Sequence, residues 1–97
     1  MNYEVETTET FQNWFDRLDH LVAFRITARI ERVKQGNFGD SKRIDESIFE
    51  LRFFFGAGYR IYYTIRGNKI IVLLSGGDKS SQKKDIRNTK SILADLE

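Results

Sequence analysis

The strongest constraint on the fold of this chain is a run of apolar residues, Ile70–Leu74, that no polar residue interrupts. Side chains of a strand point alternately to its two faces, so an apolar residue at every position predicts a strand covered on both faces. We therefore expect a central strand at residues 69–75, with further elements packed on each side. The run is far shorter than the stretch of about 18 apolar residues that indicates a membrane-spanning helix.

Two more strands are predicted before the central one. In residues 47–55 and 58–66 an apolar residue recurs at every second position, which indicates strands with one face in the core. These apolar sets are Leu51, Phe53 and Phe55 in the first strand and Tyr59, Ile61, Tyr63 and Ile65 in the second. Gly67 and Asn68 are a strong signal for a tight turn from the second of these strands into the central one. We expect the three strands to pair in chain order.

Two arginines decide how the first two strands pair. Alternation puts Arg52 and Arg60 on the face away from the core. A two-residue turn would set Arg52 against Ile61 and mix the faces, whereas an odd-length loop or a bulge sets Arg52 against Arg60. Gly56 and Gly58 can supply the positive φ that a bulged loop needs. We predict the odd loop and direct pairing of the two arginines.

The first half of the chain is predicted to be mainly helical. Tyr3 and Val5 alternate with glutamates and indicate a short first strand. Two helices follow, the first capped by Thr7 or Thr8 and the second by Asp19, and we expect them to form an antiparallel hairpin. Their apolar faces consist of Phe11, Trp14, Phe15 and Leu18 in the first helix and of Val22, Ile26, Ile30 and Val33 in the second.

The second helix is expected to end at Gly36, before an extended stretch at 42–44. Ser80 or Ser81 can cap a last helix, and the sequence leaves open whether this helix packs or frays. Together the elements predict an α+β fold in a single domain, residues 1–97. In it, an N-terminal strand and the helical hairpin pack on a mainly antiparallel sheet that a C-terminal helix follows. The apolar face of the last helix would consist of Ile86, Thr89, Ile92, Leu93 and Leu96.

Composition excludes several classes of site. The chain has no cysteine, so it can form no disulfide, thiolate nucleophile or zinc–cysteine site. Its first residues do not resemble a signal peptide, and we expect a soluble cytoplasmic protein without a membrane partner. From Arg52 to Lys90 there are nine positive residues and two negative ones, a net charge of +7. Such a charge is expected of a surface that binds nucleic acid or an acidic protein segment, but charge alone favours an ordinary solvated surface over either.

The paired arginines have two interpretations at this point. Like charges directly opposite each other across two strands are destabilising by up to about 1 kcal/mol, which favours an anionic partner for Arg52 and Arg60. Alternatively, Glu50 and nearby aspartates neutralise them, and the face is only solvated. Residue types alone do not separate these interpretations.

The order of the elements resembles the RelE/ParE superfamily of bacterial toxins, specifically the HigB-like group of addiction-module killer proteins. The most specific similarities are ELR at 50–52, GYR at 58–60 followed by an aromatic pair, and LLSGGDKSSQKKDI at 73–86. The front of the chain, FQNWFDRLDHLVAFRITARIERVKQGNFGD, is similar to the helical hairpin of that family and the loop after it. The resemblance covers nearly the whole chain and implies a RelE-like fold.

The resemblance also implies a toxin of a type II toxin–antitoxin system. Many relatives are mRNA interferases, endoribonucleases that cleave messenger RNA in the ribosomal A site. The expected partners are therefore a cognate antitoxin, most often of the helix-turn-helix type, the ribosome and mRNA. By this likeness Arg60 contacts the scissile phosphate, Arg52 is a second basic position, and Lys79 falls near a third. These three are the candidate catalytic residues.

The chemistry of such a cleavage sets clear requirements. The ribose 2′-hydroxyl must lose a proton and attack phosphorus, the added negative charge must be stabilised, and the leaving 5′-oxygen must be protonated. Arginine suits the charge because its guanidinium stays protonated and grips phosphate through two parallel hydrogen bonds. Lys79 is the candidate base, if Arg52 and Arg60 depress its pKa. His20 lies at the junction of the two helices, away from the basic strands.

RNA binding is assigned to four residues. Tyr62 shares the face of the arginines and could stack on a base or donate a proton, although packing is the commoner role of a tyrosine in a strand. Lys83, Lys84 and Arg87 belong to the positive segment beyond the glycine turn. No spacing indicates a metal site or a nucleotide-binding loop, and we expect no cofactor.

Two other functions remain open. The absence of a well-placed histidine leaves room for a non-enzymatic toxin that binds DNA gyrase, as ParE-type members of the superfamily do. A degraded prophage toxin without activity is the third possibility.

Overall fold

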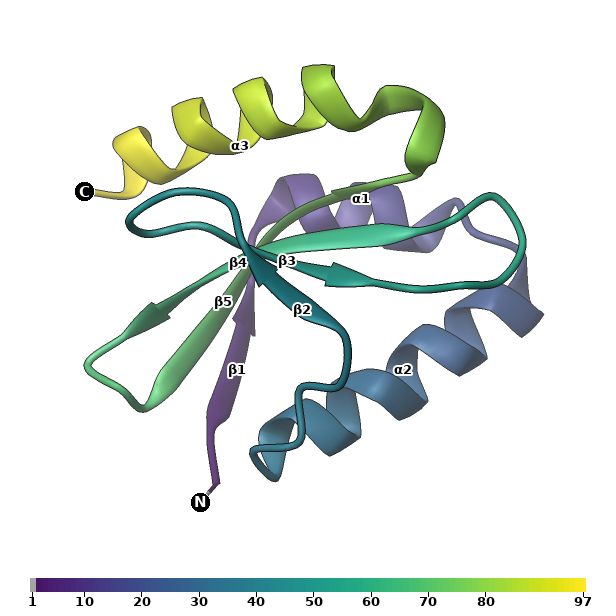
Figure 1. The fold of residues 1–97 in the computed structure, drawn as a ribbon, viewed down its shortest axis with the longest axis horizontal. Coiled ribbons are helices and arrows are strands. Elements are labelled where there is room, and N and C mark those ends of the chain that lie inside the picture. Colours follow the sequence, from purple (N-terminus) through teal and green to yellow (C-terminus); the bar gives the residue numbers. More distant parts are fainter. Residues whose placement is uncertain (1) are drawn as a thin grey trace.

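The structure is a computed structural model that describes residues 2–97. Within this range, five strands form one sheet and three helices pack against it (Figure 1). The predicted α+β fold, with a mainly antiparallel sheet and a C-terminal helix, is confirmed. In chain order the elements are β1 (Glu4–Thr7), α1 (Glu9–Asp16), α2 (His20–Lys34), β2 (Ser41–Arg43), β3 (Phe49–Arg52), β4 (Arg60–Arg66), β5 (Ile70–Gly77), the short 3₁₀ turn η1 (Lys79–Ser81) and α3 (Gln82–Leu96).

The apolar run forms an interior strand of the sheet, β5, which is covered on both faces as predicted. The strand order is β1-β5-β4-β3-β2, so β5 lies between β1 and β4. Pairing of β5 with β1 is parallel, and every other pairing is antiparallel. Residues 71–74 are buried and alternate between two apolar clusters on opposite faces of the sheet. This alternation explains why a continuously apolar strand is needed here.

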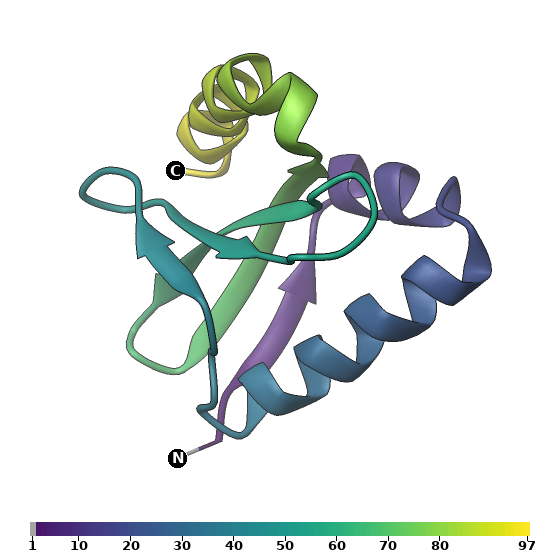
Figure 2. The same ribbon diagram turned by 45° about the vertical axis from the view of Figure 1, so that its right-hand side comes forward.

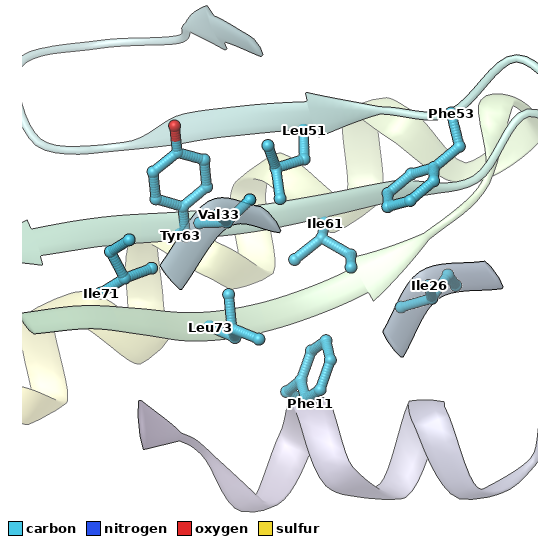
Figure 3. Close-up of a cluster of buried hydrophobic side chains, with 9 residues drawn as sticks. All are labelled: Phe11, Ile26, Val33, Leu51, Phe53, Ile61, Tyr63, Ile71 and Leu73. Carbon is cyan, nitrogen blue, oxygen red and sulfur yellow. The ribbon is translucent and has the colours of Figure 1, made fainter. Parts of the chain in front are cut away.

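The larger cluster lies between the sheet and the first two helices. Phe11 of α1 and Ile26 and Val33 of α2 approach the sheet from one side (Figure 3). The helices diverge from their junction near Asp19 and cover this face together, rather than packing along each other (Figure 2). The sheet residues of this cluster are Leu51, Phe53, Ile61, Tyr63, Ile71 and Leu73.

None of the helices in residues 2–97 has the length and apolar character needed to cross a bilayer.

The smaller cluster lies on the opposite face, under α3. Thr89 and Leu93 of α3 are buried, so the last helix packs on the sheet and does not fray. The sequence placed Arg52 and Arg60 on a face away from the core. This expectation is corrected, because the same face also carries a buried apolar cluster. The central part of this face is covered by α3, whereas Arg52 and Arg60 lie outside the buried cluster and are partly exposed. The sheet residues under α3 are Ile48, Tyr62, Val72 and Leu74.

Thr8 connects the start of α1 to an irregularity in β5. The pairing of β4 with β5 shifts between Tyr62 and Tyr63, which leaves Leu74 as an extra residue of β5. The Thr8 hydroxyl donates to the Leu74 carbonyl at 2.7 Å and accepts from the Phe11 N–H at 3.0 Å. One side chain therefore caps the helix and satisfies a carbonyl at the bulge.

The hairpin has the predicted register. Arg52 lies directly opposite Arg60, and the Phe53 N–H donates to the Tyr59 carbonyl at 3.0 Å, which closes an odd-length loop of residues 54–58. Both glycines of this loop have positive φ, +55° at Gly56 and +74° at Gly58. The prediction from alternation and turn chemistry is therefore confirmed in detail.

The close packing of Gly76 leads to a first prediction. The six-membered ring of Trp14 lies against the Gly76 Cα, where a Cβ atom would overlap ring carbons. Gly76→Ala should therefore lower the free energy of unfolding by about 1–3 kcal/mol through overpacking, measured by urea denaturation. In the double variant with Trp14→Ala the added penalty should disappear. A Gly76→Ala penalty that is the same with and without the ring would contradict this explanation.

Candidate functional site

The three predicted catalytic residues line one hollow. Arg52 at the end of β3, Arg60 at the start of β4 and Lys79 of η1 surround a cavity of about 310 Å³ beside the hairpin loop. The other lining residues are 53–58 of that loop. We call this cavity the cationic hollow. Its position follows from the register, because the Arg52–Arg60 pair lies where the two strands open into the loop.

Arg60 is held by a buried carboxylate. Its Nη1 donates to Glu50 Oε1 at 3.0 Å, and the Glu50 side chain is only 1% exposed. The other carboxylate oxygen accepts from Gln82 Nε2 at 2.9 Å, which connects β3 to the first residue of α3. Arg60 Nε is buried and has no hydrogen-bond partner within residues 2–97. Arg60 is therefore rigidly oriented and keeps unused donor capacity.

Arg52 is held at the rim of the hollow. Its Nε and Nη2 donate to the two carboxylate oxygens of Asp40 at 3.0 and 3.2 Å, which is a bidentate pair. These hydrogen bonds raise the pKa of the Arg52 guanidinium above its ordinary value. About a third of each side chain remains exposed, so solvent weakens the pair and an anion can still approach Arg52.

The two carboxylates answer the question that the sequence left open. Glu50 neutralises Arg60 and Asp40 neutralises Arg52. The two positive charges that face each other across the strands are therefore each balanced by a carboxylate. The structure thus agrees with the second interpretation as far as stability is concerned. The same contacts fix both guanidinium groups beside the hollow, which is the arrangement that preorganised anion binding requires.

Lys79 is brought to the hollow by its backbone. The Lys79 N–H donates to the Ala57 carbonyl at 3.3 Å, and Lys79 Cβ packs against Gly58. Asp78 caps the 3₁₀ turn by accepting from the Ser80 N–H at 2.8 Å and from its hydroxyl at 2.6 Å, and these hydrogen bonds lower the Asp78 pKa. Lys79 is exposed and forms no ion pair within the described chain. It is the charged group of the hollow that lacks a counterion.

An exposed phenylalanine completes the hollow. Phe54 is 81% exposed, lines the same cavity, and lies with its ring 5.8 Å from the Arg52 guanidinium carbon. A ring in this position could stack on a nucleobase whose phosphate contacts the arginines. The signal for it was present in the sequence, because alternation puts Phe54 on the arginine side of the FFF run.

Tyr62 is a corrected prediction. It shares the strand face of Arg60, but α3 covers it and it is 0% exposed, so its expected role in stacking on RNA is wrong. Burial raises the pKa of its hydroxyl, and the nearby charges of Glu50 and Asp85 raise it further. The hydroxyl has no hydrogen-bond partner within the described residues. Tyr62 is a core residue with an unusual buried polar atom.

The remaining predicted RNA-binding residues lie together on α3. Lys83, Lys84 and Arg87 are exposed and, with Lys79, line a shallow hollow of about 530 Å³. Lys79 therefore belongs to both cavities and connects them. A polyanion bound in the cationic hollow could therefore continue onto the first turns of α3 and lie next to positively charged side chains along its whole path.

Other titratable groups are placed elsewhere. His20 begins α2, is exposed, and does not line the cationic hollow. Of the charged side chains that do, only lysine can serve as an acid or base, because a guanidinium stays protonated. Residues 2–97 contain no group of three or more histidine, aspartate or glutamate side chains arranged to hold a metal ion.

Arg29 supports the site and was not predicted. From α2 it donates to the carbonyls of Phe38, Asp40 and Arg52 at 2.8–3.2 Å, and its guanidinium lies over the Phe53 ring. Burial lowers its pKa, with the charge of Arg32 as a second cause. Arg29 thus joins helix, loop and strand next to the Arg52–Asp40 pair. No local pattern marks it, because its partners are backbone carbonyls distant in sequence.

Comparison with known proteins adds a family and a fold. Residues 13–96 match the family model described as "Phage derived protein Gp49-like". A Haemophilus influenzae protein described as uncharacterized is 44% identical over 97 residues, which cover 99% of this chain and 98% of that protein. The structure of a mutant of the Escherichia coli toxin RelE in the free state is similar with a TM-score of 0.70. That match covers 91% of this chain and 98% of the RelE chain at 15% sequence identity, and it shows a shared fold.

Proposed function

This chain belongs to the Gp49-like family of phage-derived proteins, and we propose that it is the toxin of a type II toxin–antitoxin system that cleaves messenger RNA on the ribosome. The observation that carries the proposal is the cationic hollow, in which Arg52, Arg60 and Lys79 meet beside the exposed ring of Phe54. Cations with an aromatic platform suit a single-stranded nucleic acid better than a small apolar ligand. The RelE-like fold is consistent with it.

The proposed mechanism gives each side chain a separate task. The scissile phosphate binds between Arg60 and Arg52, whose guanidinium groups are held in place by Glu50 and Asp40. As the 2′-oxygen attacks phosphorus, they stabilise the added negative charge, which requires little reorganisation because both groups are already oriented. Lys79 accepts the proton of the attacking 2′-hydroxyl and returns a proton to the leaving 5′-oxygen, since it is the one charged side chain of the hollow able to exchange protons.

The products follow from this route. Attack by the 2′-hydroxyl forms a new bond from the 2′-oxygen to phosphorus and breaks the bond to the 5′-oxygen. The upstream fragment therefore ends in a 2′,3′-cyclic phosphate and the downstream fragment begins with a 5′-hydroxyl. No water enters this step, and no metal ion is required by it.

The α3 cations are proposed to hold the RNA backbone, which gives a second prediction. Replacing Lys83, Lys84 and Arg87 with glutamine should weaken binding of a single-stranded oligoribonucleotide. It should also reduce the slope of log Kd against log salt by about 2, because each lost phosphate contact accounts for about 0.7. Fluorescence anisotropy across a potassium chloride series measures both effects.

A matched variant controls for net charge. Lys42, Arg66 and Lys69 are exposed cations outside both hollows, and their replacement with glutamine removes the same charge. This control should keep most of the salt slope. If the two triple variants lose the same slope, α3 is not the RNA-binding surface.

One observation favours a second candidate function, binding of DNA gyrase without catalysis. The cationic hollow has no histidine, and the nearby Tyr62 is buried, so Lys79 must serve for all proton transfer. A ParE-type toxin would need no acid or base there. This candidate uses the same surface but predicts no cleavage of RNA.

Expression without an antitoxin tests both candidates. We expect growth arrest on induction, with primer extension showing cuts at codon-linked positions in translated messages. Gyrase-dependent breaks in DNA without such cuts would support the second candidate instead. Normal growth at a confirmed expression level would contradict the toxin function altogether.

A further inference from the structure

An apolar patch lies beside the cationic hollow without any internal partner. Leu21 and Phe24 on the outer side of α2 are 67% and 72% exposed, and Phe54 on the hairpin loop is 81% exposed. The fourth large hydrophobic residue exposed within residues 2–97 is Leu96, on α3 near the C-terminus. Isolated exposed apolar side chains are ordinary, but a cluster of aromatic ones marks an interaction surface.

The patch is hollowed rather than flat. Two adjoining cavities, of about 480 and 350 Å³, run along α2 and share Phe24, Arg25 and Phe55. The second extends to Arg52 and Asp40, so it reaches the rim of the cationic hollow. We call this continuous depression the α2 groove. Its length follows the helix from Leu21 to Arg32, which suits an elongated occupant.

The charge around the α2 groove is positive. Arg25, Arg29, Arg32 and Arg52 line it, against Asp19 and Asp40. Asp40 is already engaged by Arg52. Arg25 stacks on the Phe55 ring at 4.6 Å and, like Arg32, forms no ion pair within the described chain. Arginine beside aromatic side chains is typical of the residues that dominate binding energy in protein interfaces.

We propose that the α2 groove is the docking site of the antitoxin, through an acidic, amphipathic segment whose apolar side chains cover Leu21, Phe24 and Phe54. This inference rests on the proposed toxin function. Carboxylates of the segment would pair with Arg25 and Arg32, neither of which has a carboxylate partner among residues 2–97. A helix with one apolar and one acidic face meets both requirements, because its anchors recur every three to four residues.

Other occupants fit the groove less well. A second copy of this chain would bring the same arginines together, and like charges across an interface cost several kcal/mol. Nucleic acid would use the arginines but would leave the aliphatic side chain of Leu21 without a suitable contact. The acidic segment satisfies the apolar and the charged part of the groove at once.

The location also implies how toxicity is blocked. A segment in the α2 groove ends at Arg52 and the hairpin loop, which form one wall of the cationic hollow. It would cover Phe54 and restrict access to Arg52 without entering the space between Arg60 and Lys79. Neutralisation would thus not require contact with Arg60.

The test uses the full chain and the product of the gene next to its own as the probe. Phe24→Asp places a negative charge in the groove and lies outside the residues assigned to catalysis or RNA binding. We expect this variant to arrest growth as wild type does, and to need at least tenfold more of the neighbouring product for rescue. Isothermal titration of the purified proteins should show a Kd at least tenfold weaker.

A matched pair controls for exposure and side-chain type. Leu21→Gln should weaken binding of the neighbouring product, whereas Leu96→Gln, the same change on α3, should leave it unchanged. A toxic Phe24→Asp chain that the neighbouring product rescues like wild type would overturn the docking inference and leave the toxin function standing. A wild-type chain that is toxic but that the neighbouring product does not rescue would also overturn the docking inference alone, whereas a wild-type chain that is not toxic would overturn both.

Size-exclusion chromatography with light scattering addresses the second-copy alternative. The free wild-type chain should be a monomer at micromolar concentration. A dimer that Leu21→Gln dissociates and Leu96→Gln does not would assign the groove to a second copy and overturn the proposal.

Discussion

Replacing Arg60 with lysine should reduce the cleavage of ribosome-bound message by about two orders of magnitude or more, the effect typical of removing one donor to a developing negative charge. Lysine keeps the positive charge beside Glu50 but loses the planar fork that grips phosphate in a fixed orientation. Single-turnover cleavage with purified ribosomes measures this effect. The rate at saturating enzyme should fall, because the lost contact forms mainly in the transition state.

Two comparisons make this result specific. Arg66→Lys, at the far end of the same strand and exposed, should cleave at the wild-type rate. Arg60→Ala alone is a poor test, because it leaves the buried Glu50 carboxylate without a counterion. The double variant Arg60→Ala with Glu50→Gln removes the carboxylate charge as well, and we expect it to be inactive in cleavage. Full activity in a folded Arg60→Lys or double variant would remove Arg60 from the mechanism.

Replacing Glu50 with alanine should lower the free energy of unfolding by about 3–5 kcal/mol, because a largely buried guanidinium loses its partner. The Arg60 side chain is 15% exposed, so water can replace little of the lost pairing. Gln82 would lose its acceptor as well, which loosens the start of α3. Urea denaturation followed by circular dichroism gives the difference.

Removing both charges separates stability from function. The double variant Glu50→Met with Arg60→Met replaces the ion pair by apolar side chains of similar length and should recover most of the lost stability. It should nevertheless be inactive. Glu46→Ala, an exposed glutamate in the loop before β3, should change stability by less than about 0.5 kcal/mol. A Glu50→Ala variant as stable as Glu46→Ala would contradict the anchoring role of Glu50.

The fold was largely predictable because its signals are local. The continuous run of Ile70–Leu74 identified an interior strand covered on both faces. The two glycines of the hairpin loop, together with alternation, identified the Arg52–Arg60 register. Caps at Thr8 and Asp19 marked the starts of the helices. Each of these features depends on residues close together in the chain, so the sequence contains the information directly.

The site was less predictable because it depends on what covers the sheet. The same alternation that placed Tyr62 with the arginines could not show that α3 lies over it, since a strand face is polar or buried according to a distant element. The sequence named Glu50 and nearby aspartates as possible counterions, but it did not show the pairings that Glu50, Asp40 and Arg29 form. Their partners lie 10, 12 and up to 23 residues away, and pairing across such distances follows from the packed structure.

The central claim is that this chain cleaves RNA by attack of a ribose 2′-hydroxyl in the cationic hollow. Its most direct test uses purified ribosomes on a synthetic message, with mass spectrometry of the product ends, and a second message that carries a single 2′-deoxynucleotide immediately upstream of the cut. We predict a 2′,3′-cyclic phosphate and a 5′-hydroxyl from the first message, and no cut at that position in the second. Intact first message with active ribosomes and folded protein, or cleavage that persists at the deoxy position, would contradict the account.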